Sequence, residues 1–360
     1  MTGNDNVSAG TPSRAVRPTN RRYGVALIGA GWVAAEYVRA LAEDPRSHIT
    51  GILTRTPERG VALLAEHGVD ARRYASLDEL LADDAVDVVV SCTPPEGRAD
   101  QLCAAAAAGK HVVIEKPVAL SLAEVRAIRD AVAAAGVQST TSFVLRWNPQ
   151  VTTTKRLIDD GFLGDLVFAE SGYWHPVRPR ADSHHDWRYG HEMGVTAFVS
   201  GGCHAVDMLR FLVGDVAEVS AFGAPARGGQ PFAFDPVVTA SLRFANGAVG
   251  TVSAVLDGDT PYTFPIKLVG TQGSIQENRL HSATRLPGVP DWVSFDTVSP
   301  TSGDVAHHPF RAEISHFLDC LDSQTPSHAS IADTWRSMAT CFAIDASIAA
   351  GGQPVTVELE

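Results

Sequence analysis

The segment Tyr23-Gly-Val-Ala-Leu-Ile-Gly-Ala-Gly-Trp-Val-Ala34 decides the fold. A short apolar strand leads directly into a G-x-G-x-x-A turn, and good helix formers follow over residues 32–42. In this context Gly29 permits a tight turn, Gly31 lets the backbone approach a pyrophosphate, and Ala34 lets the helix pack against the strand. The helix N-terminus adds free N–H groups and a positive dipole end. The segment predicts a dinucleotide site that includes Trp32 and Val33.

Strands and helices alternate as far as residue 145, which predicts a parallel, doubly wound α/β sheet. The expected strands are 48–53, 86–91, 111–114 and 137–145, and the expected helices are 57–67, 77–82, 101–108 and 122–135. Ligands bind such sheets at the carboxyl ends of the strands. The residues that follow these strands are therefore expected to contact the cofactor: Cys92, Thr93, Pro94, Glu115, Lys116, Arg146 and Trp147.

The choice between NAD and NADP depends on the end of the second strand. NAD sites usually place a carboxylate there for the ribose, but this chain has Thr54 and Arg55. An arginine pairs well with a 2′-phosphate, so the pattern favours NADP over NAD. The alternative is that Arg55 stacks on adenine or points into solvent.

Composition limits the other function classes. A chain of 360 residues is long enough for two domains. The net charge of −12 disfavours nucleic-acid binding, and no apolar run is long enough to span a membrane. Five cysteines without a C-x-x-C spacing predict neither disulfides nor a zinc cluster, so a reducing, cytoplasmic location is expected. Arg21-Arg22 can imitate a twin-arginine export signal, but the following stretch is better explained as the first strand.

The remaining sequence predicts three regions. Residues 1–20 are polar and predict a disordered arm, residues 21–148 form the nucleotide-binding domain, and residues 149–360 form a second α/β domain. Alternating patterns predict strands over 165–174, 216–222, 237–244, 248–255 and 264–269, and Asn246-Gly247 predicts a hairpin, hence antiparallel pairing. A linking helix is expected over 149–160. Helices over 308–321 and 333–349 are expected to fold back toward the first domain.

At this point the chain resembles the glucose–fructose oxidoreductase, inositol dehydrogenase and rhizopine catabolism family (Gfo/Idh/MocA). The motifs that carry the resemblance are Gly29-Ala-Gly31-Trp-Val-Ala34, Cys92-Thr-Pro-Pro95, Ala108-Gly-Lys-His-Val-Val-Ile-Glu-Lys-Pro117, Leu145-Arg-Trp-Asn-Pro149, Gly161-Phe-Leu-Gly-Asp165, Gly201-Gly-Cys-His-Ala-Val-Asp207 and Gly270-Thr-Gln-Gly-Ser274. The resemblance implies a Rossmann domain followed by a domain whose open, mostly antiparallel sheet often forms homo-oligomers. It also implies that Lys116 contacts both the substrate hydroxyl and the cofactor.

Two departures from the family pattern affect the site. The threonine–proline turn usually continues Asn-x-x-His, whereas here residues 95–98 read Pro-Glu-Gly-Arg. Many dehydrogenases of the family also have aspartate four residues before the active-site histidine, and this chain has Ser200 there. The identity of the general base therefore stays open.

Three residues are the catalytic candidates. Hydride transfer from a secondary alcohol needs a base for the hydroxyl proton and donors that stabilise the developing alkoxide. Lys116 follows a buried strand and is the first candidate for the base. His204 is expected to begin a helix over 205–212, whose N-terminus lowers the histidine pKa and keeps it neutral. Asp207 lies on the same helical face and is expected to orient the histidine or the lysine. Glu115 is expected to orient the nicotinamide end or its loop.

Residues 173–191 are rich in aromatic, histidine and arginine side chains, a composition suited to a sugar or cyclitol. Trp174, His175, Trp187 and Arg188 are the predicted substrate contacts, together with Lys116 and His204. The four histidines of this segment match no standard metal spacing, so no metal is predicted.

The first hypothesis is an NAD(P)-dependent dehydrogenase acting on a sugar, glycoside or inositol. A second is an enzyme that retains its cofactor and uses transient oxidation for elimination or glycoside cleavage. A third is a non-catalytic, nucleotide-dependent sugar sensor.

Overall fold

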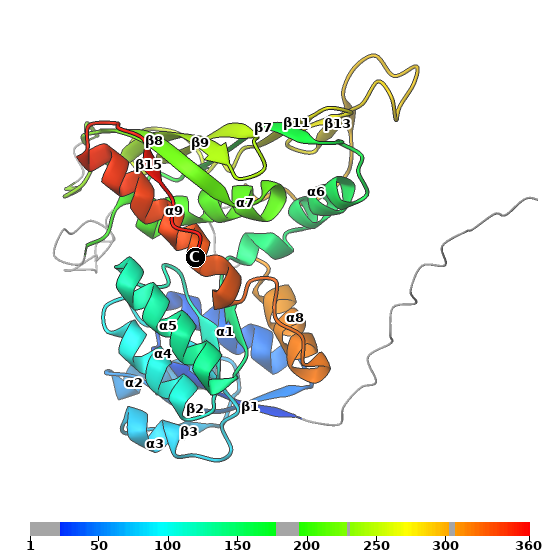
Figure 1. Cartoon of the computed structure of the whole chain (residues 1–360). Coiled ribbons are helices and arrows are strands. Elements are labelled where there is room, and N and C mark those ends of the chain that lie inside the picture. The colour runs from blue at the N-terminus through cyan, green and yellow to red at the C-terminus, as the bar shows by residue number, and fades with distance from the viewer. Residues whose placement is uncertain (1–21, 178–193, 229–230, 302–306) are drawn as a thin grey trace, which may run out of the picture.

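The structure is a computed structural model that describes residues 22–177, 194–228, 231–301 and 307–360. Figure 1 shows two β-sheets, one above the other, with helices between them. The predicted arm at residues 1–20 lies outside the described residues.

The first half of the chain forms a parallel sheet, as predicted, but the sheet has six strands, because a short strand over residues 72–73 was not expected. Its strands run in the order β3-β2-β1-β4-β5-β6, the Rossmann arrangement: β1 (Tyr23–Ile28), β2 (Ser47–Leu53), β3 (Arg72–Arg73), β4 (Val88–Ser91), β5 (His111–Ile114) and β6 (Ser139–Thr141). The helices between them are α1 (Trp32–Glu43), α2 (Pro57–Glu66), α3 (Leu77–Leu81), α4 (Arg98–Ala107) and α5 (Leu122–Ala135). Ser76 and Ser121 cap α3 and α5, because each hydroxyl accepts the backbone N–H three residues on.

The last strand of this sheet is shorter than predicted. The expected strand over 137–145 ends at Thr141, and a 3₁₀ turn η1 (Val144–Trp147) replaces its second half before helix α6 (Pro149–Asp159). The turn begins where the Phe143 N–H bonds back to the Thr141 carbonyl at 2.7 Å. Val144 and Leu145 are buried in this turn, so an apolar sequence here does not by itself indicate a strand.

The second half builds a nine-stranded sheet in the order β14-β13-β12-β11-β7-β10-β9-β8-β15. Its strands are β7 (Leu166–Trp174), β8 (Val216–Ala224), β9 (Val237–Phe244), β10 (Val249–Val255), β11 (Ile266–Gly270), β12 (Ser274–Gln276), β13 (Arg279–His281), β14 (Val293–Ser294) and β15 (Val355–Thr356). Among these described strands β7 and β10 pair in parallel and the other pairs are antiparallel. The Asn246-Gly247 turn joins β9 to β10 as predicted, with Gly247 at φ +91°.

Helices cover one face of this second sheet. They are α6, α7 (Cys203–Val213) with a preceding π-helical turn η3 (Phe198–Gly202), and α9 (Ile331–Ala349), and Figure 1 shows them between the two sheets. Helix α8 (Phe310–Ser323) returns to the first domain as expected. Its Phe310 ring packs edge-on against Tyr37 of α1 at 5.0 Å between centroids. Both domains therefore contribute to the region between the sheets.

Candidate active site

Two adjoining cavities lie at the carboxyl edge of the parallel sheet. One is lined by the glycine turn and the end of β2, and the other lies between the two domains. They share four lining residues, Gly31, Cys92, Thr93 and Pro94. A long ligand can therefore reach from the Rossmann sheet into the space between the domains.

The first cavity has the backbone features of a pyrophosphate site. Gly29 adopts φ +101°, and a Cβ there would lie 3.0 Å from the Cys92 backbone. A Cβ on Gly31 would meet nothing within 4 Å, so the backbone is open to the cavity at this point. Within the described part of the chain no side chain caps the N-terminus of α1, and the first turn of this helix carries no acidic residue. These features fit a dinucleotide held as the sequence predicts.

The adenosine end of this cavity is lined by Thr54, Arg55 and Thr56. Arg59 of α2 lines it as well and was not predicted, because it lies one helical turn beyond the expected motif. Glu96 lines the same cavity. The cavity therefore contains a carboxylate, although none follows the second strand, where NAD sites usually place one.

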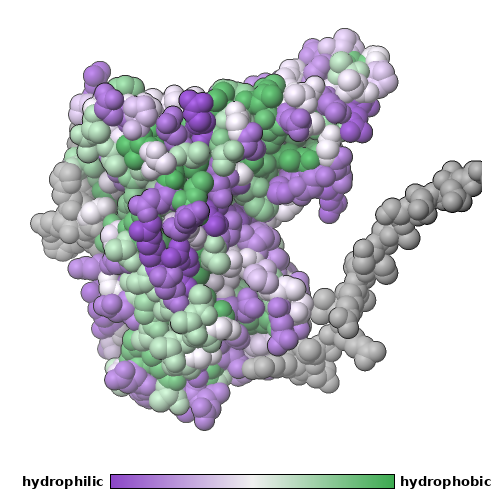
Figure 2. Space-filling model, in the orientation of Figure 1, coloured by the Kyte–Doolittle hydropathy of each residue, from purple (hydrophilic) through white to green (hydrophobic). Residues whose placement is uncertain are grey.

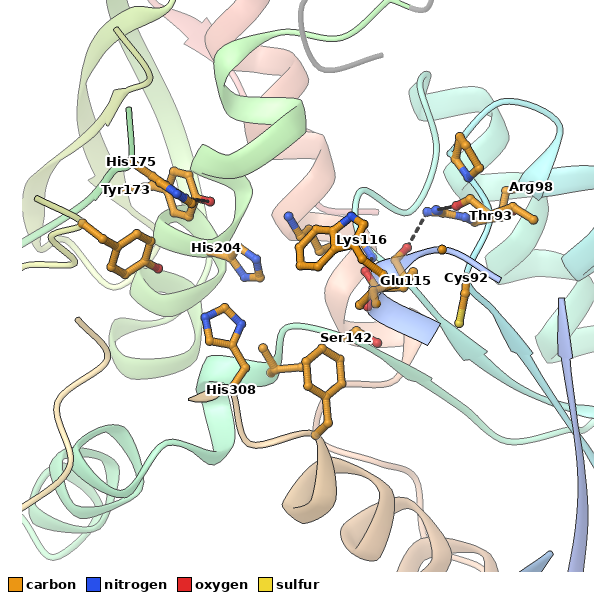
Figure 3. Close-up of a pocket in the computed structure, with 17 residues that line it drawn as sticks. Cys92, Thr93, Arg98, Glu115, Lys116, Ser142, Tyr173, His175, His204 and His308 are labelled. Carbon is orange, nitrogen blue, oxygen red and sulfur yellow. Dashed lines mark hydrogen bonds between the residues drawn. The ribbon is translucent and has the colours of Figure 1, made fainter. Parts of the chain in front are cut away.

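The second cavity brings Lys116 and His204 together from different domains. Lys116 follows β5, and its Nζ donates to the Ser200 carbonyl at 3.3 Å. His204 lies in the first turn of α7, and Figure 3 shows its ring and the Lys116 side chain directed into the same space. The His204 ring stacks on Tyr173 at 5.9 Å between centroids and is 5% exposed. Its Nδ1 is buried and has no partner among the described residues.

The carbonyl that Lys116 contacts belongs to the π-helical turn before His204. A π turn interrupts the regular i→i−4 hydrogen bonding of a helix and is often found at functional sites. The Ser200 carbonyl, within this turn, accepts from Lys116, so the residue that replaces the family's aspartate acts here through its main chain. Gly201 is required, because a Cβ there would lie 2.3 Å from the Tyr173 ring.

The predicted cause of the histidine's neutrality is wrong, because His204 does not begin its helix; the π turn precedes it. The predicted direction is right. Burial lowers the pKa of His204 well below its ordinary value, and the positive charge of Lys116 lowers it further, with smaller contributions from His308 and His175. The imidazole is therefore neutral at pH 7.

Asp207 does not orient either catalytic candidate, contrary to the prediction. Its carboxylate pairs with Arg146, at 2.7 Å from Nε and 2.6 Å from Nη2, and accepts from Ser337 at 2.7 Å. Arg146 also pairs with Asp333 at 2.8 Å. Arg146 is thus committed to a buried ion-pair cluster and does not line either cavity, which corrects its prediction as a cofactor contact.

Trp147, also predicted to contact the cofactor, does not line either cavity. Its ring packs against His328 at 4.7 Å and His316 at 5.5 Å between centroids, away from the lining of both cavities. The expected strand end is a 3₁₀ turn, which rotates residues 146 and 147 away from the sheet edge where Ser142 and Val144 line the cavity.

The strand β7 decides which of the predicted substrate residues reach the cavity. Tyr173 and His175 line it, and the Tyr173 hydroxyl bonds the His175 Nδ1 at 2.9 Å. Trp174 points to the opposite face of the sheet, where its Nε1 donates to Ser253 at 2.8 Å, so its prediction as a substrate contact is wrong. Trp187 and Arg188 lie outside the described residues.

Several lining residues were missed by the sequence analysis. Tyr173 could have been predicted, because it lies two residues before His175 on the same face of the strand. Tyr262 comes from a connecting segment without a motif, and its hydroxyl is buried without a partner among the described residues. His308, just before helix α8, also lines the cavity. The other missed residues are Arg98, Ser142, Val144 and Phe310.

Glu115 and Arg98 shape the wall between the two cavities. The Arg98 guanidinium donates to the carbonyls of Glu115, at 2.5 Å, and of Thr93 and Pro117. The Glu115 carboxylate accepts from the Lys116 N–H at 2.9 Å and from the Tyr37 hydroxyl at 3.2 Å. Figure 3 shows Glu115 and Arg98 beside Thr93 and Cys92. These bonds hold the loop that carries Lys116 in place.

The described residues contain no cluster of three or more histidine, cysteine, aspartate or glutamate side chains suited to a metal ion. None of the helices among them has the length and apolar character needed to cross a membrane.

Comparison with known proteins identifies the family. The model of the oxidoreductase family with an NAD-binding Rossmann fold matches residues 23–143, and the model of the GFO/IDH/MocA C-terminal domain matches residues 151–276. The chain belongs to the GFO/IDH/MocA family of oxidoreductases.

Individual relatives agree with this assignment. Levoglucosan dehydrogenase of Pseudarthrobacter phenanthrenivorans is 34% identical over 71% of this chain and 73% of its own length. The scyllo-inositol 2-dehydrogenase (NAD(+)) of Bacillus subtilis is 28% identical over 69% of this chain and 71% of its own. A solved structure of levoglucosan dehydrogenase in complex with NADH and levoglucosan has a TM-score of 0.85 at 24% identity, and the match covers 94% of this chain and all of that one. The structural match confirms the predicted fold.

Proposed function

We propose that this chain is an NAD(P)-dependent dehydrogenase that transfers a hydride between nicotinamide and a secondary hydroxyl or ketone of a sugar, glycoside or cyclitol. The observation that carries the proposal is the meeting of Lys116 and His204, from different domains, in a cavity that adjoins the glycine turn. Relatives named as levoglucosan and inositol dehydrogenases support the substrate class.

The two residues have separate roles in this proposal. A nicotinamide dinucleotide held by the glycine turn would supply the hydride acceptor or donor. Lys116, as the neutral amine, takes the hydroxyl proton and becomes the ammonium ion, and His204, held neutral by its burial, positions the same oxygen through a hydrogen bond. The Tyr262 hydroxyl, which lacks a partner among the described residues, donates to a further substrate oxygen. The Tyr173 and Tyr262 rings supply apolar faces for the ring of the substrate.

We propose that the cofactor contacts are the residues that line the two cavities: Gly29, Gly31, Trp32, Val33, Thr54, Arg55, Cys92, Thr93, Pro94, Glu115 and Lys116. Arg55 and Arg59 favour NADP because both line the end where a 2′-phosphate would lie. Relatives are named for either cofactor. Comparing kcat/KM for NADP+ and NAD+ in the Arg55→Ala and Arg59→Ala variants tests this preference, and an unchanged ratio in both contradicts it.

The test of the overall proposal is a substrate screen. Sugars, anhydrosugars and cyclitols are offered with NAD+ and with NADP+, and the absorbance of the reduced cofactor is followed. Sustained reduction of added cofactor supports a dehydrogenase. Product formation without net reduction would indicate instead an enzyme that retains its cofactor. Calorimetry without heat for any pyridine dinucleotide would overturn the proposal.

We also propose a homo-oligomer formed through the uncovered face of the nine-stranded sheet. Exposed apolar residues on these strands include Phe222 at 63%, Val249 at 47% and Val269 at 39%. Figure 2 shows hydrophobic residues gathered along the upper edge of the view, over the strands of this sheet. An analytical ultracentrifugation run that finds only monomers contradicts this interface.

Two remaining expectations stay proposals. The domain division at residues 21–148 and 149–360 is supported by the change from parallel to mostly antiparallel pairing. A cytoplasmic location is supported by the five cysteines, which are all unpaired.

A further inference from the structure

Four buried polar side chains form a chain of hydrogen bonds beneath the cleft. Glu115 bonds the Tyr37 hydroxyl at 3.2 Å, Tyr37 bonds the Ser142 hydroxyl, and Ser142 bonds Oε1 of Glu313 at 3.0 Å. The four residues come from the ends of β5 and β6 and from α1 and α8, and each is at most 6% exposed. Ser142 and Glu115 also line the cavity that holds Lys116, as Figure 3 shows.

The number of hydrogen bonds determines how many carboxyl protons these four side chains hold. Three contacts between four oxygens need three hydrogens, and the two hydroxyls supply only two. If both carboxyls were ionised, one contact would lack a hydrogen and two like charges would be buried together. If both were protonated, one hydrogen would lack an acceptor, since Oε2 of Glu115 receives the Lys116 N–H and Oε2 of Glu313 has no partner among the described residues. One proton satisfies every contact.

The surrounding charges indicate where that proton rests. Lys116 and Arg98 face Glu115 and favour its ionised form, whereas Glu313 is influenced chiefly by its burial and by Glu115. Burial raises the pKa of Glu313 well above its ordinary value and that of Glu115 less strongly. The other titratable neighbours, Tyr37 and Cys92, also have pKa values raised by burial and stay neutral.

We propose that Glu115 and Glu313 share a single proton through Tyr37 and Ser142, and that Glu313 is thereby a positioning residue that sets the charge of Glu115 beside the cofactor. In the resting arrangement Glu313 donates to Ser142, Ser142 to Tyr37, and Tyr37 to the Glu115 carboxylate. Passing one hydrogen along each contact moves the proton to Glu115 and leaves Glu313 ionised. No proton or electron is gained or lost in the exchange.

This inference rests on the proposed function for its consequence. A negative Glu115 favours the oxidised nicotinamide, which carries a positive charge, and a neutral Glu115 favours the reduced form. The four hydrogen-bonded side chains therefore let the charge of Glu115 change with the redox state of a bound dinucleotide. No proton needs to be exchanged with solvent.

The first experiment uses the protein without cofactor. We expect an infrared C=O stretching band of a protonated carboxyl group in the wild type above pH 7, where Asp345, whose pKa is raised to about 7 by burial, is mostly ionised. The Asp345→Asn variant identifies any remaining contribution from that group. Absence of a buried carboxylic-acid band in the wild type would overturn the proposal without recourse to any further variant.

Two isosteric variants then distinguish a proton shared by Glu115 and Glu313 from a proton that belongs to Glu313 alone. In Glu313→Gln the amide donates to Ser142 and Glu115 stays ionised. In Glu115→Gln the backbone N–H of Lys116 holds the amide oxygen in place, so the amide N–H points to Tyr37. Tyr37 then donates to Ser142 and Ser142 to Glu313, so Glu313 stays ionised. We expect the band to vanish in both, although each variant keeps one of the two carboxyls. If the band persists in Glu115→Gln, the proton belongs to Glu313 alone and the proposal fails. Exposed Glu66→Gln is the matched control that leaves the band unchanged.

The second experiment measures the affinity for oxidised and reduced dinucleotide. Relative to the wild type, Glu313→Gln should favour the oxidised form, and Glu115→Gln should favour the reduced form, each by about fivefold. Equal shifts in the same direction contradict the proposed coupling. If neither form binds to the wild type, the proposed function fails, whereas the infrared result on the shared proton still stands.

Discussion

His204 and Asp207 lie on the same helix, α7, and both are almost fully buried, yet their surroundings differ. Asp207 has a bidentate arginine and a serine hydroxyl, so its charge is fully compensated. His204 contacts two aromatic rings, Phe143 edge-on and Tyr173 stacked, and its Nδ1 has no partner among the described residues. Leaving a buried polar atom unpaired costs about 1–3 kcal/mol.

The difference separates structural from chemical roles. The polar groups around Asp207 satisfy one another and leave nothing for a ligand to bind. The groups around His204, namely Lys116 and the Tyr262 hydroxyl, retain hydrogen-bonding capacity directed into a cavity. We therefore infer that changes near Asp207 act on stability and that changes near His204 act on catalysis. Each of the following variants tests one side of this comparison.

The largest effect is expected for Lys116→Ala. Removing the proposed proton acceptor should lower kcat/KM by about 10³-fold, within the range for general acid–base groups. Binding of the dinucleotide, measured by calorimetry, should persist because the glycine turn is untouched. Lys110→Ala is the matched control, since its Nζ only caps the carbonyls of Asp83 and Val86 at 3.0 and 2.9 Å. If Lys116→Ala retained its activity, the inference that the residues around His204 act in catalysis would be wrong.

On the structural side, Asp207→Asn should lower the free energy of unfolding by about 3 kcal/mol, because a buried arginine loses its main counter-charge. Denaturant unfolding measures this loss, and kcat at a permissive temperature should change less than threefold. Asp333→Asn should cost less, since that side chain is 39% exposed. A large fall in kcat with unchanged stability would show that Asp207 acts on the chemistry after all.

The neutral state of His204 predicts a dependence of stability on pH. Its pKa is depressed in the fold, so the unfolded chain takes up a proton at higher pH than the native protein does. Stability from this group is present above the unfolded pKa of about 6.5 and is lost as the pH falls below it, by up to about 1.4 kcal/mol per pH unit. His204→Phe should flatten the decline between pH 6.5 and 5. An identical slope in the variant would show that the ring is protonated in the native state.

Tyr262→Phe tests the unpartnered hydroxyl. If it bonds a substrate oxygen, the variant should lose about tenfold in kcat/KM, mostly through KM, and should be no less stable than the wild type. Tyr74→Phe is the control, because its hydroxyl already bonds Asp83 at 2.8 Å in the Rossmann domain. Unchanged kinetics would place the substrate elsewhere in the cavity.

The sequence alone was sufficient for the Rossmann fold and for placing Lys116 at the carboxyl edge of its parallel sheet. The strand–turn–helix signal is local, and the carboxyl ends of parallel strands share one edge whatever the loops do. It was insufficient for Arg146 and Asp207, since their partners, Asp333 and Ser337, are distant in the chain and no local pattern shows that an ion pair will close. Tyr262 was missed for the same reason.

Trp174 shows a different kind of failure. Its neighbours Tyr173 and His175 line the cavity, so in the described part of this segment the prediction failed only in the face of the strand. Aromatic and polar residues lie on both faces here, and alternation assigns a face only when the two faces differ in polarity.

The smallest effect is accordingly expected for Trp174→Phe. Its indole bonds Ser253 on the face opposite the cavity, so kcat/KM should stay within twofold of the wild type. Tyr173→Phe, one residue away, should lower it severalfold, because the lost hydroxyl releases the His175 ring that lines the cavity. If the uncovered sheet face forms the oligomer, Trp174→Phe should weaken association in ultracentrifugation while Tyr173→Phe leaves it intact. Kinetic effects in the reverse order would mean that β7 presents its other face to the substrate, and that Trp174, the original prediction, is the sugar contact.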